Sequence, residues 1–206
     1  MTIRYHKGDL PDLKAYETAS AVAVDSETLG LNPNRDRLCV VQLSPGDGSA
    51  DVIQISRGQK TAPNLEALMS DPAKAKIFHF ARFDVAVLLH YLNIRVTPVW
   101  CTKIASKLVR TYTDRHGLKD ITRELIGVEL SKQQQSSDWA AETLSDAQLA
   151  YAASDVLHLH ALKEKLEFML AREERGHLAA ACFEFLPVRA ELDLKGWEET
   201  DIFAHS

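Results

Sequence analysis

Two acidic residues stand together at the end of an apolar run, in the stretch AVAVDSETLGL of residues 21–31. Asp25 and Glu27 are separated by one residue, so on a strand both side chains point to the same face. A D-x-E pair alone is weak evidence of a site, because short acidic pairs recur by chance. Its position strengthens the case, since residues 21–24 are typical of a buried strand and ligands of α/β sheets commonly bind at strand ends.

Two further acids and a tyrosine occupy similarly apolar segments. Asp84 lies between Phe83 and Val85 in a helical pattern, where an unpaired charge is costly. An acid that complements the helix dipole in the first turn is the ordinary explanation of such a residue. Asp155 lies in YAASDVLHLHAL, and Tyr151 precedes it by about one helical turn on the same face. A structural pair, in which the phenol donates a hydrogen bond to the carboxylate, is a competing explanation.

Together, the four carboxylates are explained if they converge on two hard divalent cations, whose charge offsets the burial of theirs. Two such ions about 3.5–4 Å apart stabilise the attacking and leaving oxygens when a phosphodiester is hydrolysed. Tyr151 is then placed to orient or deprotonate the attacking water, although a pKa near 10 makes a free phenol a poor base. The expected ions are Mg²⁺ or Mn²⁺.

The elements that must position these residues begin with strands. Runs rich in β-branched and apolar residues, separated by short Gly, Pro and Asn signals, cover residues 21–27, 37–46 and 50–56. Their short links predict antiparallel neighbours. The segment 64–71 is typical of a helix, and 74–80 predicts a fourth strand that leads directly into a helix over 81–92.

Beyond residue 92 the pattern is almost wholly helical. Apolar residues recur at helical spacing over 101–112 and 116–127. Ser145 and Gln148 form the pattern of a helix start, from which one helix is expected to run to about Arg172. Strands first and helices after, around a mixed central sheet, predict an α/β fold with an extra C-terminal helix and tail.

Length and composition limit the class of protein. The chain of 206 residues is 46% hydrophobic and 26% charged, which suits one soluble domain over residues 1–206, and no apolar run approaches the roughly 20 residues of a membrane span. Three scattered cysteines and an N-terminus without the pattern of a secretory signal favour the cytoplasm. With a net charge of −5, a polyanionic substrate must be short, bound through metal ions or met by a local basic patch.

One candidate basic patch falls in a segment with a helical pattern. Its members are Arg110, Arg115, His116, Lys119, Arg123 and Lys132. A solvated helix face is the more ordinary explanation of such a set of charges, and the sequence alone favours it.

Three motifs together resemble the DEDD exonucleases, in the subgroup with a tyrosine and in the ribonuclease D-like branch. They are DSETLGL, HFARFD and YAASDVLHL, in the family's order. The run SKQQQSSDW followed by LSDAQLAYAASDV also resembles the ribonuclease D pattern ahead of the tyrosine motif. The resemblance covers most of the chain and implies a ribonuclease H-like exonuclease fold, with a mixed sheet flanked by helices.

The resemblance implies a metal-dependent 3′-to-5′ exoribonuclease. The helical HRDC domains of full-length ribonuclease D are not expected here, and the chain is most similar to a stand-alone bacterial member of the branch. That likeness implies hydrolysis of short oligoribonucleotides, especially diribonucleotides, to nucleoside 5′-monophosphates. It also implies a ring-like homo-oligomer, an octamer, in whose contacts the C-terminal helix and tail, about residues 176–206, are expected to take part.

The same resemblance implies the roles of individual residues. Asp25, Glu27 and Asp155 would hold the cation that activates water, Asp25 would be shared with a second cation near Asp84, and Tyr151 would position the water. The expected substrate-binding residues are Thr28, Leu29, Leu31, His79, Phe80, Arg82, Gln135, Ser136, Ser137 and Trp139. Those in the polar run 133–138 are suited to bind phosphate or the 2′-hydroxyl that distinguishes RNA from DNA.

Several of these contacts have structural alternatives. Leu31 would wedge beside the last base or pack in a turn. Phe80 stands where the family motif commonly has Asn, and its ring would stack on a base or belong to the core. His79 and Arg82 are candidate phosphate contacts, with core or capping roles as the alternative. Trp139 is favoured as a packing anchor over a base platform.

Other functions stay open at this point. Within the same class, the chain would trim the 3′ ends of longer, tRNA-type RNA, or act on DNA as well. From a different class, a non-catalytic module would bind nucleotide or metal in the same cleft. That module would require a damaged carboxylate set, and the sequence shows none.

Overall fold

A computed structural model describes residues 2–131 and 133–205 and contains a six-stranded sheet. The strands are β1 (Thr2–Lys7), β2 (Ala21–Thr28), β3 (Leu38–Ser44), β4 (Ser49–Gln54), β5 (Ala75–Phe78) and β6 (Val99–Cys101), in the order β1-β4-β3-β2-β5-β6. β3 is antiparallel to both β2 and β4, and the other neighbouring pairs are parallel. The mixed sheet, with antiparallel neighbours along β2, β3 and β4, is therefore confirmed.

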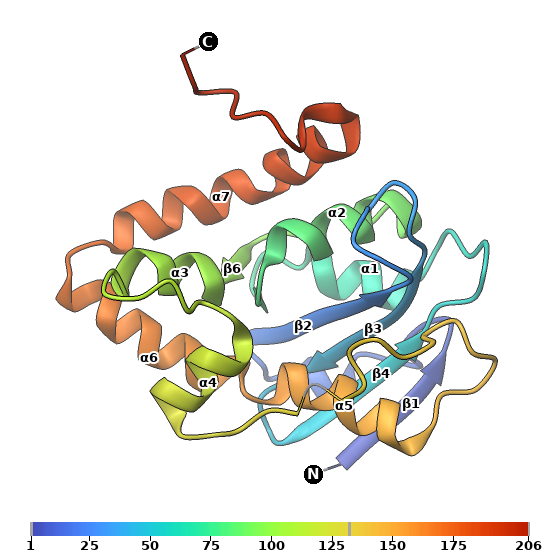
Figure 1. Cartoon of the computed structure of the whole chain (residues 1–206). Coiled ribbons are helices and arrows are strands. Elements are labelled where there is room, and N and C mark those ends of the chain that lie inside the picture. The colour runs from blue at the N-terminus through green and yellow to red at the C-terminus, as the bar shows by residue number, and fades with distance from the viewer. Residues whose placement is uncertain (1, 132, 206) are drawn as a thin grey trace.

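Helices cover both faces of this sheet (Figure 1). They are α1 (Pro63–Ser70), α2 (Ala81–Leu92), α3 (Thr102–Val109), α4 (Leu118–Ile126), α5 (Asp146–Leu157), α6 (Leu159–Arg172) and α7 (Gly176–Leu192). A 3-10 turn, η1 (Lys14–Tyr16), follows β1, and a π-helical turn, η2 (Asp193–Trp197), follows α7. None of the helices is long and apolar enough to cross a membrane within the described part of the chain.

The single helix expected to run to Arg172 is wrong, because two helices meet at His158. The start is as predicted: Ser145 and Gln148 form a capping box, in which Ser145 Oγ accepts from the Gln148 backbone N–H. α5 contributes Ala152 to the smaller core cluster and Ala153 and Val156 to the larger one, and α6 adds Leu159 to the larger cluster. The helical run is interrupted between them at His158, which has φ −104° and ψ −4°.

Two strands have no counterpart in the sequence-based prediction. β1 lies at the edge of the sheet and is half-exposed, so its residues TIRYHK alternate too weakly to mark a strand. β6 is only three residues long, below the length at which periodicity can be recognised. Both pair in parallel with distant partners, β4 and β5, and this pairing is what makes them strands.

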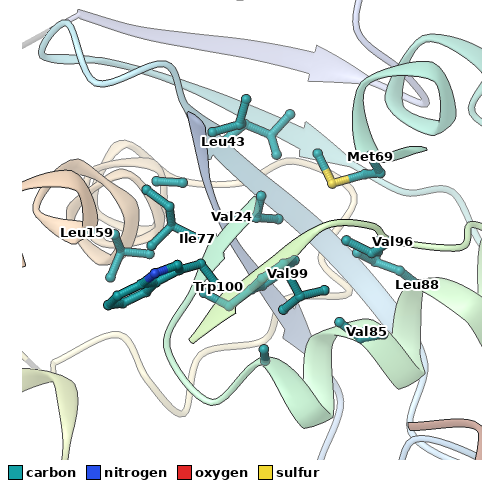
Figure 2. Packing of buried hydrophobic residues seen from close by; sticks show 14 of the residues in the cluster. Val24, Leu43, Met69, Ile77, Val85, Leu88, Val96, Val99, Trp100 and Leu159 are labelled. Carbon is teal, nitrogen blue, oxygen red and sulfur yellow. The ribbon is translucent and has the colours of Figure 1, made fainter. Parts of the chain in front are cut away.

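The larger core lies between the sheet and the helices α1, α2, α3, α6 and α7 (Figure 2). Val24 of β2 and Ile77 of β5 share this cluster with Val85 and Leu88 of α2 and with Leu159 of α6. A smaller cluster lies on the other face, beneath α5. Since both faces of β2 and β3 are covered, the ends of these strands are held rigidly, which is what a precise site requires.

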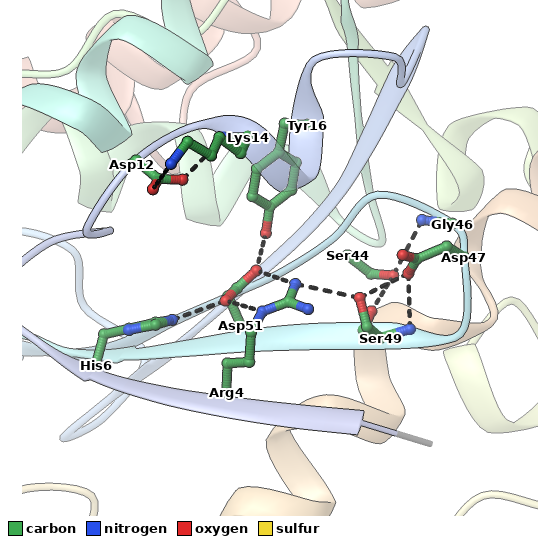
Figure 3. A network of polar contacts seen from close by, with 10 residues as sticks. All are labelled: Arg4, His6, Asp12, Lys14, Tyr16, Ser44, Gly46, Asp47, Ser49 and Asp51. Atoms are coloured by element: carbon green, nitrogen blue, oxygen red, sulfur yellow. Dashed lines mark hydrogen bonds and ion pairs between the residues drawn. The ribbon is translucent and has the colours of Figure 1, made fainter.

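A buried ionic network ties β1 and η1 to β4 (Figure 3). The Asp51 carboxylate on β4 accepts hydrogen bonds from Arg4 Nε and Nη2 at 2.8 and 2.7 Å and from the Tyr16 hydroxyl at 2.6 Å. His6 Nε2 lies 2.7 Å from the same carboxylate. Burial raises the pKa of Asp51, but the hydrogen bonds from Arg4, Tyr16 and His6 outweigh it and hold this pKa below its usual value.

Replacing Asp51 should reveal this network as a pH-dependent source of stability. A carboxyl whose pKa is lower in the folded state stabilises the fold above its unfolded pKa, and the effect is lost as pH falls through the folded pKa. We expect Asp51→Asn to lower the free energy of unfolding by about 3 kcal/mol at pH 7, and by progressively less as pH falls below about 4 toward the folded pKa of Asp51. Urea unfolding at several pH values measures this.

The matched control is Asp12→Asn, because Asp12 is an exposed acid paired with Lys14. It should change stability little at either pH. Equal losses for Asp51→Asn at pH 3 and pH 7 would contradict a role for the Asp51 charge.

Candidate active site

The acids predicted from the sequence meet in one cleft of about 730 Å³. Asp25 and Glu27 project from the same face of β2, as their spacing requires. Asp84 lies in the first turn of α2, which follows β5, the parallel neighbour of β2. Tyr151 and Asp155 come from α5. All five residues line the cleft, so elements far apart in the sequence converge at the end of β2.

Three of the carboxylates lie close enough to share an ion. Asp25, Glu27 and Asp155 each offer an oxygen, and these oxygens lie within 4.8 Å of one another. Asp84 stands outside this trio but lines the same cleft. A set made only of carboxylate oxygens matches hard divalent cations. The residues present therefore fit a divalent metal centre.

The electrostatics of the trio also fit a cation. Burial raises the pKa of Asp25, and the charges of Asp84, Asp155 and Glu27 raise it further. Burial likewise raises the pKa of Glu27, Asp84 and Asp155. Negative charge is thus disfavoured at each of these carboxyls until a positive charge or a proton offsets it.

Two polar residues that sequence reasoning missed hold the acids in place. Gln42 lies opposite Asp25 in the β2–β3 register, and its Nε2 donates to Asp25 Oδ2 at 2.7 Å. Ser26 Oγ donates to Asp84 Oδ1 at 2.6 Å, which links β2 to α2. In the sequence, Gln42 could have been recognised as a candidate site residue because it is the one amide in the apolar run LCVVQLS. Its partner, Asp25, could be identified only from the strand register.

The Tyr151 hydroxyl is protonated and can donate a hydrogen bond. Burial raises its pKa, and the charges of Asp155, Glu27 and Asp25 raise it further. At neutral pH the phenol therefore stays protonated. Trp139 packs against it, with ring centroids 6.0 Å apart, and is fully buried. This burial is what a packing anchor requires and leaves little ring surface for a base.

The turn after β2 presents apolar side chains to solvent. Leu31 is 88% exposed and Leu29 is 53% exposed, and both line the cleft. Thr28 Oγ1 donates to the Gly30 carbonyl at 2.5 Å. A Cβ on Gly30 would lie 2.3 Å from an Asp36 carboxylate oxygen, so a larger residue there would displace this carboxylate from its bonds with Asn32 and Arg35.

The other predicted substrate contacts divide into those that line the cleft and one that does not. Gln135, Ser136, Ser137, His79 and Phe80 line it. The cleft also includes Lys119 from the candidate basic patch.

His79 reaches the cleft in its neutral form. Its Nδ1 lies 2.9 Å from Thr102 Oγ1. Burial and the nearby Lys103 charge lower the pKa of His79 to about 3. Any contact it makes with phosphate at neutral pH would therefore be a neutral hydrogen bond.

Arg82 lies outside the cleft. Its Nε and Nη2 donate to the Asp193 carboxylate at 2.5 and 2.8 Å, and Nη2 also donates to the Glu198 carbonyl. The guanidinium thus fastens the first turn of α2 to the segment that follows α7.

The basic patch divides in a similar way. Arg110 is fully buried and forms an ion pair with Glu124. Arg123 lies 3.4 Å from Asp120. Lys132 falls outside the described residues. Among the members of the patch that the structure describes, Lys119 is the one that lines the cleft.

Comparison with known proteins agrees with this geometry. The family model of the 3′-5′ exonuclease domain matches residues 12–171. The chain belongs to the 3′-5′ exonuclease family. All the residues predicted to be catalytic or metal-binding lie within the matched range. The resemblance to the DEDD exonucleases of the ribonuclease D-like branch is confirmed.

Individual relatives place the exonuclease more narrowly. Ribonuclease D of Gluconacetobacter diazotrophicus is 34% identical over 154 residues, and the aligned part covers 75% of this chain but 39% of that protein. The chain thus spans less than half the length of such curated relatives. The structure of Escherichia coli RNase D, at 24% identity and a TM-score of 0.76 over 86% of this chain and 47% of that chain, shares the fold.

Over its whole length the exonuclease is similar to Brucella melitensis NrnC. The NrnC structure with bound Mg²⁺ is 66% identical, with a TM-score of 0.96 and full coverage of both chains. NrnC has also been solved bound to pGG. These matches confirm the expected likeness to a stand-alone bacterial member of the branch and the ribonuclease H-like exonuclease fold.

The crowded carboxylates should make the exonuclease respond to divalent cations through its stability. We expect Mg²⁺ to raise the melting temperature of the wild type in proportion to the logarithm of its concentration, because it binds the folded state. Asp155→Asn should raise the melting temperature by a few degrees without metal, since it removes one repelling charge, and should abolish most of the response to Mg²⁺. Differential scanning fluorimetry measures both effects.

Asp146→Asn is the matched control, because Asp146 belongs to the same helix but does not line the cleft. It should keep the wild-type response to Mg²⁺. If Asp155→Asn responded as the wild type does, Asp155 would not be a ligand.

Proposed function

We propose that the protein is a metal-dependent 3′-to-5′ exoribonuclease that hydrolyses short oligoribonucleotides, especially diribonucleotides, to nucleoside 5′-monophosphates. The observation that carries the proposal is the convergence of Asp25, Glu27 and Asp155 within 4.8 Å, with Asp84 and Tyr151 in the same cleft. The full-length similarity to Brucella NrnC, which has been solved bound to pGG, supports a short substrate.

The proposed cofactor is a pair of divalent cations, Mg²⁺ or Mn²⁺. Asp25, Glu27 and Asp155 would hold one ion, and Asp25 and Asp84 would hold the other. When bound, the two ions supply Lewis-acid stabilisation of the charge on the attacking and leaving oxygens. The Mg²⁺-bound structure of Brucella NrnC supports the choice of metal.

The chain's own side chains would prepare the attacking water and the carboxylates. The protonated Tyr151 hydroxyl donates a hydrogen bond to the oxygen of the water, which turns a lone pair toward phosphorus. Gln42 and Ser26 keep Asp25 and Asp84 from rotating away. The water oxygen bonds to phosphorus and gives up one proton to solvent, the bond to the 3′-oxygen of the preceding nucleotide breaks, and that oxygen takes up one proton from solvent as it leaves, so that one water molecule is consumed. The terminal residue is released as a 5′-monophosphate.

The dimensions and charge of the molecule favour a short substrate. A cleft of about 730 Å³ lies in the range of small-molecule sites. Long nucleic acid needs many cationic contacts with phosphate, whereas the net charge is −5 and Arg82, Arg110 and Arg123 are engaged by acids. Leu31 would lie beside the terminal base, with the backbone near Thr28 and Leu29 at its sugar. Gln135, Ser136 and Ser137 would contact phosphate or the 2′-hydroxyl.

We also propose that the protein works as a ring-like homo-oligomer, an octamer, in the cytoplasm. α7 itself is part of the core, through Phe183 and Leu186. Its other side leaves Leu178 and Val188 46% and 51% exposed, and in the segment after it Phe203 is 77% exposed and Ile202 is 42% exposed. Apolar surface for subunit contacts is thus present along the whole region of residues 176–206 that is expected to take part.

The carboxylates and Tyr151 should be separable by kinetics. Asp25→Asn is expected to lower kcat on a dinucleotide by about 10³-fold or more, because it removes a ligand shared by both ions. Tyr151→Phe should lower kcat by about 10²-fold with little change in KM, since it removes only the hydrogen bond to water. Circular dichroism should show an unchanged fold. Asp146→Asn again serves as the control, and substantial activity in Asp25→Asn would disprove the assignment.

Substrate length distinguishes the proposed function from its alternatives. We expect kcat/KM for a diribonucleotide to exceed that for a 20-nucleotide RNA or a DNA dinucleotide by about tenfold or more. Preference for long RNA would indicate ribonuclease D-like trimming, and equal turnover of DNA would indicate a general exonuclease. Binding without turnover at any Mg²⁺ or Mn²⁺ concentration would indicate a non-catalytic module. Light scattering of the double variant Ile202→Ser/Phe203→Ser shows whether the oligomer dissociates. The same length assay on this variant and on the wild type then shows whether the preference for short substrates depends on assembly.

A further inference from the structure

Phe80 has a backbone conformation that its side chain does not favour. It precedes α2 at the N-cap position with φ 67° and ψ 45°, in the left-handed region. N-cap residues are ordinarily extended, and bulky residues are rare at positive φ. The other non-glycine residues with positive φ in the described chain, Asn93 and Glu174, follow the ends of helices, where this conformation is routine.

The Phe80 side chain contributes little to the packing of the fold. It is 44% exposed and makes no capping hydrogen bond to α2. Its ring forms part of the wall of the active-site cleft and of two adjoining pockets of about 450 and 300 Å³. A strained, exposed aromatic at the mouth of a site is better explained by a ligand than by packing.

A lysine lies on one face of this ring. Lys103 Nζ, from α3, is 4.4 Å from the Phe80 ring centroid. No carboxylate in residues 2–131 and 133–205 lies within 4.0 Å of that ammonium. The cation–π attraction favours this orientation of the ring and places a positive charge in the pocket of about 300 Å³ beside the cleft. Phe80 also lines the cleft and the pocket of about 450 Å³, which Lys103 does not line, so the residue offers surface to another group there.

We propose that Phe80 is the stacking platform for the nucleobase that precedes the terminal one, with Lys103 beside the phosphate of that nucleotide. The inference rests on the proposed function. Leu31 and Phe80 both line the cleft and the pocket of about 450 Å³ beside it. With the terminal base next to Leu31, the next base reaches the mouth where Phe80 stands. Aromatic stacking tolerates any base, so the platform would select for length more than for sequence.

The left-handed backbone makes the proposal testable, because stability and binding should change in opposite directions. Asparagine tolerates this conformation and favours the N-cap position. We expect Phe80→Asn to keep or raise the melting temperature while raising KM for a dinucleotide about tenfold or more, with kcat changed less than about threefold. Phe80→Tyr should keep the wild-type KM, and Phe80→Leu, which is apolar without an aromatic face, should not.

A substrate whose first nucleotide lacks its base gives the decisive comparison. For the wild type, removing that base should raise KM about tenfold. For Phe80→Asn, whose KM is already raised, removing the base should change KM very little. Phe168→Asn is the control, because Phe168 is a 70% exposed aromatic outside the cleft, and its KM values should match the wild type.

Several results would overturn the platform. They are an unchanged KM in Phe80→Asn, a wild-type KM in Phe80→Leu, a fall in melting temperature that accompanies the loss of activity, or dissociation of subunits in light scattering. If the wild type hydrolysed no dinucleotide, the proposed function itself would fail, and this is distinct from a wild type that is active and a variant that is unaffected.

Discussion

Mutual repulsion among carboxylates is the constraint on which the rest of the structure depends. Asp25, Glu27 and Asp155 are held together although burial opposes the ionisation of all three and neighbouring charge further opposes that of Asp25 and Glu27. No element gains stability from this arrangement. It persists because the strand and helix that carry these acids are fixed elsewhere, by apolar residues such as Val24 and Val156 in the core. The packed fold therefore holds the carboxylates in positions where divalent cations would offset their negative charge.

The mixed topology of the sheet brings the side chains of the site together around Asp25. Antiparallel β3 places Gln42 opposite Asp25, whereas parallel β5 leads into α2 and so brings Asp84 to the end of β2. α5 crosses the remaining side with Tyr151 and Asp155. Each partner comes from a different connection, so an error in any one pairing would separate the group it carries from the others.

The sequence predicted those parts of the molecule that local pattern determines. The acids were recognisable because they interrupt apolar runs, and the helix start at Ser145 because its cap is made by Gln148, only three residues away. What escaped prediction depends on distant partners. The bond from Gln42 follows from strand register, and the burial of Arg110 depends on its ion pair with Glu124. From the sequence, Arg82 was a candidate phosphate contact with a core or capping role as the alternative, whereas in the structure it forms an ion pair with the distant Asp193.

The bridge from Arg82 to Asp193 makes the end of the chain part of the frame around the site. Arg82 lies two residues before Asp84, and its guanidinium also donates a hydrogen bond to the Glu198 carbonyl, while Arg189 donates to the same Asp193 carboxylate. The turn of α2 that holds Arg82 also carries Asp84. A disturbance of the segment around Asp193 and Glu198 would therefore reach the acids of the cleft through α2, although neither residue lines that cleft.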